Sequence, residues 1–292
     1  MNNHTLTEKF AQYLKEDGKR LPTIQSYTGD VDRFLAYLQQ MGSHFDGNLK
    51  RFHITSYRNR LIEDGYEAST VNKKINSLQA FNLWLINQGM TADDVVDRKR
   101  DKVKTASGSE KQVEVFTEKQ LEKLLFCIQS DANSRDRAVV LTLLYTGVRV
   151  GELCDIKLKN IDFLINHLKI IGKGGKLREV PLKPEVIEAI TAYLPERASN
   201  KAADTGYLFL GQRETLQRDA VNTLLERLAD KAGLAIRLKP HTFRHTFCTR
   251  LVKKGVPLPI ISKLAGHSSI ETTARFYINS SREDKIQAVS VL

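Results

Sequence analysis

The stretch His241-Thr242-Phe243-Arg244-His245 directly follows Pro240 and places an arginine between two imidazoles. Proline favours the first helical turn, so we expect a helix over residues 240–254. His241 and Arg244 are three residues apart and would project from one face toward a single anion. Arginine offers a planar fork for two phosphate oxygens, and imidazole can carry a proton near neutral pH. Taken alone, this pair fits a structural histidine or an ion-binding helix tip better.

Three enzyme classes find little support around this stretch. His241 and His245 have the spacing of a zinc-binding helix, but Thr242 occupies the position of the glutamate that a zinc hydrolase needs. Neither the Gly-x-Ser-x-Gly motif of serine hydrolases nor the phosphate loop of nucleotide hydrolases occurs. The three cysteines are widely spaced, which argues against a disulfide framework or a zinc knuckle. These motifs therefore indicate neither a zinc hydrolase nor a nucleotide hydrolase.

Residues 115–292 mix helices with a short β-hairpin. A Thr-Glu-Lys-Gln capping box at residues 117–120 and an apolar run over 135–145 predict two helices. Residues 168–171 and 177–182 are typical of strands, and the glycine-rich stretch 172–176 between them is typical of a hairpin turn. Further helices are expected over residues 184–194, 218–232, 257–265 and 269–277. The predicted fold is mainly α with a small β-sheet.

Residues 1–95 show helical periodicity throughout. Apolar residues recur at three- and four-residue steps over 24–38, 54–61 and 71–85, and Thr5 to Glu8 have the spacing of a capping box. We predict a bundle of four or five helices. The polar side of the helix near residue 75 fits either a solvated face or a DNA contact. The candidate DNA-binding residues on it are Asn72, Lys73, Lys74 and Asn76.

A change of pattern separates these two regions. Residues 96–114 lose the apolar periodicity and include the basic residues Arg98, Lys99 and Arg100, followed by small and polar residues. We predict a basic, extended linker between domains 1–95 and 115–292. Its cations could displace counterions from DNA phosphates, and an ordinary solvated tether fits equally well.

The overall charge favours a polyanionic partner. The chain has 292 residues with 45 Lys and Arg against 34 Asp and Glu, for a formal net charge of +11. Nucleic acid is the first candidate for such a balance. No apolar run is long enough for a membrane span, and the N-terminus lacks the pattern of a secretion signal. We expect a cytoplasmic protein that does not bind membranes.

Five blocks of sequence, in order, resemble the signature of tyrosine recombinases, also called the phage integrase family. The resemblance covers roughly residues 115–285, and the helical region before it resembles the core-binding domain of simple members such as Xer recombinases and transposon cointegrate resolvases. The blocks are Thr146-Gly147-Val148-Arg149-Val150-Gly151-Glu152-Leu153, Gly172-Lys173-Gly174, residues 241–245, Leu264-Ala265-Gly266-His267-Ser268-Ser269 and Thr272-Thr273-Ala274-Arg275-Phe276-Tyr277.

The resemblance implies a role for each of six residues. Arg149 and Arg244 would hold the non-bridging oxygens of the scissile phosphate, and Lys173 would protonate the leaving 5′ oxygen. His241 would exchange the proton of the nucleophile, and His267 would donate a hydrogen bond to the phosphate. Tyr277 would attack and form a covalent phosphotyrosine. Fixed cationic donors can replace metal ions in phosphoryl transfer, so the resemblance implies no cofactor.

Two features depart from the family pattern. Tyr277 follows His267 by ten residues, whereas nine is the commoner spacing, and Phe276 occupies the ninth position. The histidine that often follows the nucleophile is replaced by Ile278 and Asn279. In isolation each candidate also fits a bland role: Tyr277 a half-buried helix residue, Arg149 an ion pair with Glu152. Lys173 alone fits an exposed turn residue, and Lys176 is a rival for its role.

The resemblance implies strand exchange between two duplexes. It predicts a tetramer on double-stranded DNA with a specific core site, strand exchange through a Holliday junction, and resolution of cointegrates or dimers of a mobile element, plasmid or chromosome. Integration or excision of a small element, relaxation like that of a type IB topoisomerase, and DNA binding without chemistry are the alternatives. The apolar C-terminal tail fits docking on a neighbouring subunit or on its own domain.

Overall fold

The computed structural model describes residues 3–43, 45–104, 114–172, 175–212, 214–267 and 269–278, without the side chains of Arg275, Tyr277 and Ile278. Internal contacts divide the chain into two units, Met1–Glu110 and Lys111–Leu292. Each unit has its own apolar core. Among the described residues, no helix is long and apolar enough to cross a membrane.

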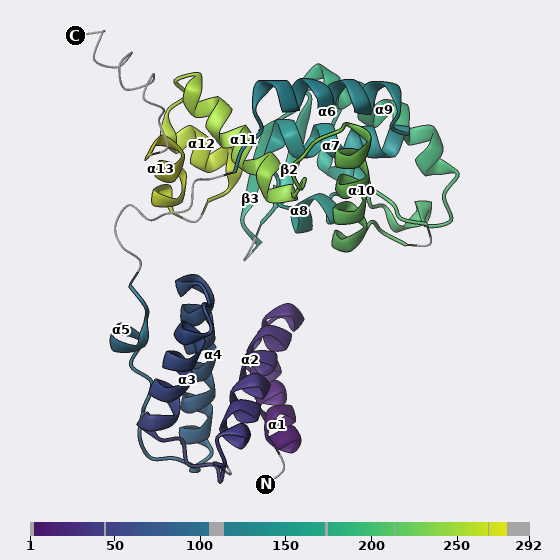
Figure 1. Cartoon of the computed structure of the whole chain (residues 1–292). Coiled ribbons are helices and arrows are strands. Elements are labelled where there is room, and N and C mark those ends of the chain that lie inside the picture. The colour runs from purple at the N-terminus through teal and green to yellow at the C-terminus, as the bar shows by residue number, and fades with distance from the viewer. Residues whose placement is uncertain are drawn as a thin grey trace, which may run out of the picture. The chain divides into compact units, whose positions relative to one another are not determined.

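The first unit is a helical bundle, as the apolar stripes predicted (Figure 1). Its helices are α1 (Asn3–Glu16), α2 (Leu21–Gln40), α3 (Arg51–Glu63), α4 (Ala68–Asn87) and α5 (Arg98–Asp101). Helix α4 lies at the centre of the packing and contacts each of the others. Its Phe81 and Trp84 stack at 5.6 Å between ring centroids, and Phe10 of α1 packs edge-on against Phe81 at 5.3 Å. Burial of these aromatic rings stabilises the bundle.

Helix α1 begins before the predicted capping box. The described helix already includes Asn3, so Thr5 lies inside it rather than at its start. Thr7 is also internal, and its hydroxyl donates to the carbonyl of Asn3 at 3.1 Å and to Asp32 of α2 at 2.7 Å. Spacing suited to a capping box therefore does not decide where a helix starts when the hydroxyl can bond within the helix or to a neighbouring one.

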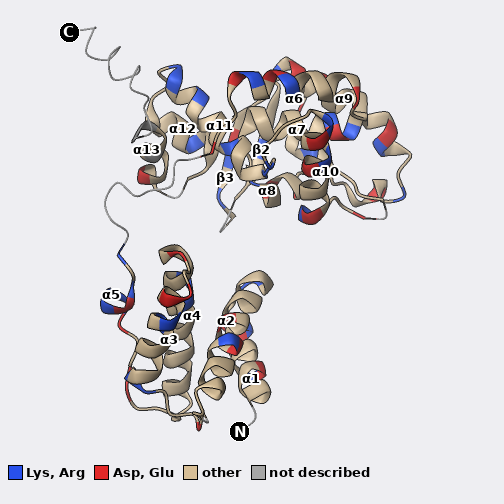
Figure 2. Cartoon of the chain, in the orientation of Figure 1, with Lys and Arg blue, Asp and Glu red and all other residues tan. Residues whose placement is uncertain are grey.

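The first part of the predicted extended linker is folded onto the bundle instead. Val96 is 3% exposed and belongs to the core, and Asp101 is fully buried and accepts a bidentate bond from Arg51. Asn72 of α4 exchanges two hydrogen bonds with the backbone of Val103, at 3.1 and 2.8 Å. Basic and acidic residues adjoin in the short helix α5 (Figure 2). Residues 105–113 lie outside the described part.

The second unit combines helices with the predicted hairpin. Its helices are α6 (Glu118–Ser130), α7 (Ser134–Thr146), α8 (Val150–Cys154), α9 (Pro184–Ala198), α10 (Arg218–Lys231), α11 (Pro240–Lys253), α12 (Leu258–Ala265) and α13 (Ile270–Ile278), with 3-10 turns at Leu158–Asn160 and Ala203–Thr205. Strands β1 (Ile161–Asp162), β2 (His167–Ile171) and β3 (Leu177–Pro181) form an antiparallel sheet in the order β1-β2-β3. This confirms a mainly helical fold with a small β-sheet.

Helix α7 is the centre of the second core. It is buried along almost its whole length, from Ala138 to Leu144, and packs against α9 and α11. The predicted capping box of α6 is present, with Thr117 accepting from the backbone N–H of Gln120 at 3.2 Å and the Gln120 side chain accepting in return. Because α7 is buried up to its last residue, Thr146, the turn that follows it is held in place.

We expect Asn72→Ala to release the segment around Val103 from α4. The change removes both hydrogen bonds to the Val103 backbone, each of which contributes about 1 kcal/mol net. Hydrogen exchange at the Val103 amide should become faster, as measured by nuclear magnetic resonance. Asn76→Ala, an exposed position one turn later on α4, is the matched control and should leave the exchange unchanged. Equal exchange in both variants would contradict the docked segment.

Candidate active site

The turn between α7 and α8 carries Arg149 and depends on Gly147. Gly147 has a φ of 60°, in the left-handed region that glycine adopts at little cost. A Cβ atom on it would lie 2.4 Å from the ring of Phe247 in α11. Arg149 follows as the N-cap residue of α8. The close approach of this turn to α11 brings Arg149 beside the helix that holds His241 and Arg244.

The carboxylate of Glu152 accepts hydrogen bonds from two arginines. Arg149 donates its backbone N–H to Oε2 and Nη1 to Oε1, each at 2.9 Å. Arg178 of β3 donates Nη1 to Oε1 at 3.0 Å and Nη2 to Oε2 at 2.7 Å. Burial alone raises the pKa of Glu152, but the hydrogen bonds and charges of both arginines outweigh it and lower the pKa overall. Glu152 is therefore an ionised anchor.

Arg149 thus makes the ion pair with Glu152 that was predicted from their three-residue spacing, and part of its side chain remains accessible. Its Nη2 also donates to the carbonyl oxygen of Gly266 at 2.9 Å. The side chain is still 39% exposed. Pairing with Glu152 orients the guanidinium without enclosing it, so the structural interpretation and a phosphate-binding role are compatible.

Arg244 is a buried cation with an unused donor. Its side chain lies on α11 and is 4% exposed, and Nη1 donates to the carbonyl oxygen of Gly147 at 2.7 Å. Among the described residues, its Nη2 is the one buried side-chain nitrogen or oxygen without a hydrogen-bond partner. Burial, followed by the nearby charge of Arg149, lowers the pKa of Arg244. A buried charged donor without a partner is costly unless a ligand supplies the acceptor.

His241 and His245 lie one turn apart on α11, with 5.9 Å between ring centroids. The His241 ring is at the exposed surface, yet partial desolvation, followed by the charges of Arg244 and Arg149, lowers its pKa. Desolvation, followed by His241, lowers the pKa of His245. The ring of His245 packs against Phe276 at 5.6 Å between centroids. The charges of both arginines therefore act on His241, and His245 contacts the helix α13.

His267 lies in the turn between α12 and α13 and is held by α13. Its Nδ1 is 2.8 Å from Oγ1 of the buried Thr273, and its ring stacks on Phe276 at 6.1 Å between centroids. Burial is the largest cause that lowers the pKa of His267 to about 4, and Arg244 and Arg149 contribute further. The contact with Thr273 leaves Nε2 as the ring nitrogen available to a ligand.

Two of the six predicted catalytic residues do not have a described side chain. Lys173 lies outside the described residues, although its neighbour Gly172 is described, and a Cβ on Gly172 would lie 3.6 Å from Oε1 of Glu152. The backbone of Tyr277 is in α13, but its side chain is not described. Phe276 beside it is 7% exposed and belongs to an apolar cluster with Cys248, Ile261 and Ala265. The structure therefore brings together Arg149, Arg244, His241 and His267.

The predicted DNA-binding residues of the first unit fall into different environments. Lys74 is 5% exposed and pairs with the buried Asp30 at 3.2 Å, so its burial disagrees with a direct DNA contact. Helical periodicity cannot distinguish a buried lysine that has a partner from an exposed one. Lys73 also pairs with Asp30, at 3.1 Å, but remains about half exposed. Asn72 holds Val103, as described above. Arg98, Lys99 and Arg100 are exposed.

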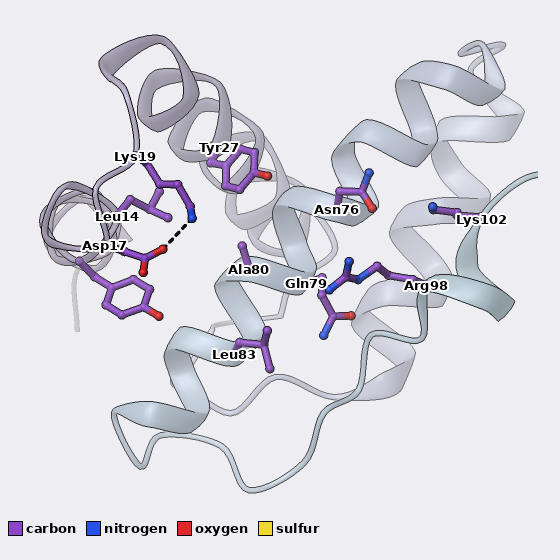
Figure 3. A pocket seen from close by; sticks show the side chains of 11 residues that line it. Leu14, Asp17, Lys19, Tyr27, Asn76, Gln79, Ala80, Leu83, Arg98 and Lys102 are labelled. Carbon is purple, nitrogen blue, oxygen red and sulfur yellow. Dashed lines mark ion pairs between the residues drawn. The ribbon is translucent and has the colours of Figure 1, made fainter. Parts of the chain in front are cut away.

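A polar hollow lies next to these residues on the first unit. Its volume is about 500 Å³, and Arg98 and Lys102 reach toward Asn76 and Gln79 across it (Figure 3). Lys19 and Asp17 form an ion pair at 2.7 Å on its other side. It is lined by Tyr13, Leu14, Asp17, Lys19, Tyr27, Asn76, Gln79, Ala80, Leu83, Arg98 and Lys102. Cations and amides at one surface are typical of a phosphate-contacting face.

Within the described ranges, no three His, Cys, Asp or Glu side chains gather as metal ligands would. The ring of His241 lies 5.9 Å from that of His245, and the ring of His245 packs against Phe276 instead. Cys127, Cys154 and Cys248 are free thiols. Burial raises the pKa of each thiol, to about 11 for Cys154 and Cys248. Uncharged thiols at these positions fit packing residues, as the sequence indicated.

Comparison with known families decides the class of the protein. The model of the Phage integrase family matches residues 114–284, more than half of the chain, and the model of the phage integrase N-terminal SAM-like domain matches residues 7–89. The chain is a tyrosine site-specific recombinase of the phage integrase family. This confirms the resemblance inferred from the ordered motifs.

Individual relatives of this recombinase span nearly its whole length. It is 33% identical to the TnP I resolvase of Bacillus thuringiensis over 281 residues, which is 92% of this chain and 93% of that protein. It is also 33% identical to tyrosine recombinase XerA of Pyrococcus furiosus, over 91% of this chain and 86% of that protein. The structure of XerH site-specific recombinase bound to difH substrate has the same fold, with a TM-score of 0.75, 21% identity and coverage of 100% of this chain and 85% of that one.

Sequence reasoning missed Arg178 and Thr273, which position other site residues. Glu152 was identified only as a possible partner of Arg149, and its second arginine was not anticipated. Arg178 was assigned to a strand, and because it lies two residues before the apolar Val180, the period of a strand could have shown that it shares the inward face of Val180. Thr273 gave no signal, since a hydroxyl that bonds to a histidine six residues away depends on how the turn folds.

We expect the imidazole of His267 to titrate near pH 4 in the DNA-free recombinase, below its ordinary value of 6.5. Above pH 6.5 the ring is neutral in both folded and unfolded chains. As the pH falls toward 4, the unfolded chain takes up a proton and the folded one does not, so stability is lost. His267→Gln should therefore lose less unfolding free energy between pH 7 and pH 5.

Nuclear magnetic resonance titration of the histidine rings, with His267→Gln to assign the signal, measures the pKa directly. Urea unfolding at the two pH values measures the stability difference. A His267 pKa at or above 6.5 would contradict the desolvated position described here.

Proposed function

We propose that this recombinase cleaves and rejoins double-stranded DNA at a specific core site through a 3′-phosphotyrosine formed by Tyr277. The observation that carries the proposal is the buried Nη2 of Arg244, which lacks an acceptor and lies near Arg149 and His241. A phosphodiester supplies the missing acceptor and the negative charge together. Arginine forks bind phosphate oxygens in pairs, which gives the substrate a defined orientation.

In the proposed reaction, the phenolic oxygen of Tyr277 attacks the phosphorus and the bond to the 5′ oxygen breaks. Arg149 and Arg244 stabilise the charge that develops on the non-bridging oxygens. His241 accepts the phenolic proton, and Lys173 gives a proton to the leaving oxygen. His267, whose pKa favours a neutral ring, donates one hydrogen bond to the phosphate. The phosphotyrosine conserves the energy of the broken bond, so a 5′ hydroxyl can reverse the step without fuel.

DNA binding is proposed for both units. Residues 1–95 act as the core-binding domain and residues 115–292 as the catalytic domain, with the segment 96–114 between them. The candidate contacts of the first domain that remain are its exposed residues Lys73, Asn76, Arg98, Lys99 and Arg100. Asn76 and Arg98 also line the polar hollow. The net charge of +11 supports a partner that releases counterions when bound.

For the biological role, we propose resolution of cointegrates or of dimeric plasmids or chromosomes. The support is the resolvase among relatives that span more than nine-tenths of the chain. Four protomers on two core sites would exchange strands in pairs through a Holliday junction, in the bacterial cytosol. Integration or excision of a small element uses the same chemistry, so formation of the covalent adduct is expected for either role.

We expect Tyr277→Phe to abolish the covalent adduct and to leave DNA affinity unchanged. The probe is a duplex that Tyr277→Phe protein selects from a random-sequence library. The duplex is prepared as a set of substrates whose nicks differ in position by one base. Where the nick lies close to the scissile phosphate, cleavage releases a short fragment, which prevents religation and traps the adduct. The adduct is detected by denaturing gel electrophoresis, and its loss follows because phenylalanine has no oxygen to attack with.

A tyrosine exchange is the matched control for the unusual spacing. In Phe276→Tyr/Tyr277→Phe the tyrosine stands nine residues after His267, at the buried position of Phe276. The proposal predicts no adduct from this double variant, since the hydroxyl enters an apolar cluster. Adduct formation by it, or by Tyr277→Phe alone, would overturn the assignment. Wild-type protein that binds tightly and never cleaves would instead indicate a DNA-binding relative without chemistry.

A further inference from the structure

Arg178 closes a ring of hydrogen bonds that joins three separate segments of the second unit. It lies on β3 and its side chain is only 11% exposed. Its Nη1 and Nη2 bind both oxygens of Glu152 at the start of α8, and its Nε donates to the carbonyl oxygen of Leu264 at 3.0 Å. Arg149 completes the ring through Glu152 and Gly266. The hairpin, the Arg149 turn and the turn before His267 therefore meet around one carboxylate.

Glu152 has no acceptor capacity to spare in this arrangement. Each of its oxygens accepts two hydrogen bonds, one from Arg149 and one from Arg178. A carboxylate has about four lone-pair sites, so the set is complete. Because Arg178 takes the bidentate fork, Arg149 is left with a single bond from its guanidinium to Oε1. Arg178 thereby limits how firmly Glu152 can hold Arg149.

The turn before His267 is held by both arginines. Gly266 has a φ of 67°, and a Cβ on it would lie 2.7 Å from Nη1 of Arg178. Its carbonyl oxygen accepts from Arg149 on the other side. The backbone that leads into His267 is thus packed directly on the Arg178 guanidinium. A displacement of Arg178 would move Arg149 and His267 together.

We propose that Arg178 is a positioning residue for DNA cleavage, which keeps Arg149 available to the scissile phosphate and His267 in register with it. This inference rests on the proposed function, since it requires that Arg149 binds phosphate. Without Arg178, Glu152 has free acceptors and draws Arg149 into a bidentate pair, away from the substrate. Arg178 itself stays behind Glu152 and does not touch the DNA.

Replacement of Arg178 should slow cleavage without weakening DNA binding. In Arg178→Lys the charge remains but a single ammonium cannot bind both carboxylate oxygens and Leu264. Arg178→Gln removes the charge as well. We expect single-turnover cleavage of the nicked duplex to fall roughly 100-fold in both variants, the loss that a misplacement of about 1 Å produces. Affinity in gel-shift assays should not change.

Arg237→Gln is the matched control for loss of an arginine–glutamate pair. Arg237 binds Glu226 through Nε at 2.9 Å and through Nη2, on an exposed surface. Exposed pairs contribute little, so cleavage should equal that of the wild type. Thermal melting of each variant identifies any that fail to fold. Arg178→Lys is the milder of the two, and its rate decides the outcome if Arg178→Gln does not fold.

A neutral substrate separates positioning from mere structural support. In a duplex with a methylphosphonate at the scissile position, the reacting group carries no negative charge for Arg149 to balance. The defect of Arg178→Lys should then shrink to about tenfold or less, and that of Arg149→Ala should shrink in parallel. If Arg178→Lys slows cleavage roughly 100-fold on both substrates while the defect of Arg149→Ala shrinks on the neutral one, the positioning role is overturned.

The Arg149→Ala variant distinguishes failure of the proposed function from failure of the positioning role of Arg178. If its defect does not shrink on the neutral substrate, Arg149 does not act on the phosphate charge, and the proposed function fails together with this inference. If it shrinks while the Arg178 defect does not, only the inference fails.

Discussion

The hydrogen bond from Arg244 to the carbonyl oxygen of Gly147 is the interaction on which the candidate site depends. It ties α11 to the turn after α7, and it does so with a buried cation that retains one unpaired nitrogen. Such an arrangement costs free energy in the absence of a ligand. The buried α7 and the tight contact between Gly147 and Phe247 hold Arg244 in this position. The fold of the second unit therefore maintains a strained electrostatic arrangement that an anion relieves.

Arg149, Arg178 and Arg244 bring more positive charge to the site than the carboxylate of Glu152 balances. Glu152 is the one carboxylate in contact with Arg149 and Arg178 among the described residues. Arg178 binds it and the carbonyl oxygen of Leu264 through all three of its side-chain nitrogens, whereas Arg149 binds it and Gly266 and keeps an open side. Arg244 lies beyond the reach of Glu152 for a hydrogen bond and is influenced by it only at longer range. Burial, followed by the same excess of positive charge, lowers the pKa of His241 and His267, which favours neutral rings that can exchange protons with a substrate.

Much of this fold could be predicted from the sequence because its signals are local. Apolar periodicity found the helices, and the glycine-rich stretch between two β-type runs found the hairpin. Local signals failed where a contact with a residue far away in the sequence determines the structure. Lys73 and Lys74 both pair with Asp30, yet Lys74 is buried in the bundle and Lys73 is about half exposed. The segment after residue 95 has the composition of a tether, yet Arg51 and Asn72, far away in sequence, fix it.

The candidate site could likewise be predicted only in part from the sequence. Motifs in the right order identified Arg149, His241, Arg244 and His267 as neighbours, which no single motif justified. The ring through Arg178 could not be predicted, because it joins residues 149–152, 178 and 264–266 through contacts that only the folded sheet and turns create. The use of Tyr277 follows from the buried environment of Phe276 and remains a proposal, because the Tyr277 side chain lies outside the described structure.

The unfolding free energy of Arg244→Met, measured by urea denaturation without DNA, tests the central claim most directly. Methionine fills similar space without a buried charge. If Arg244 is held for a phosphate rather than for folding, the variant should be at least as stable as the wild type and should form no covalent adduct. A loss of more than about 3 kcal/mol, as expected when one partner of a buried ion pair is removed, would contradict the account and make Arg244 a structural residue.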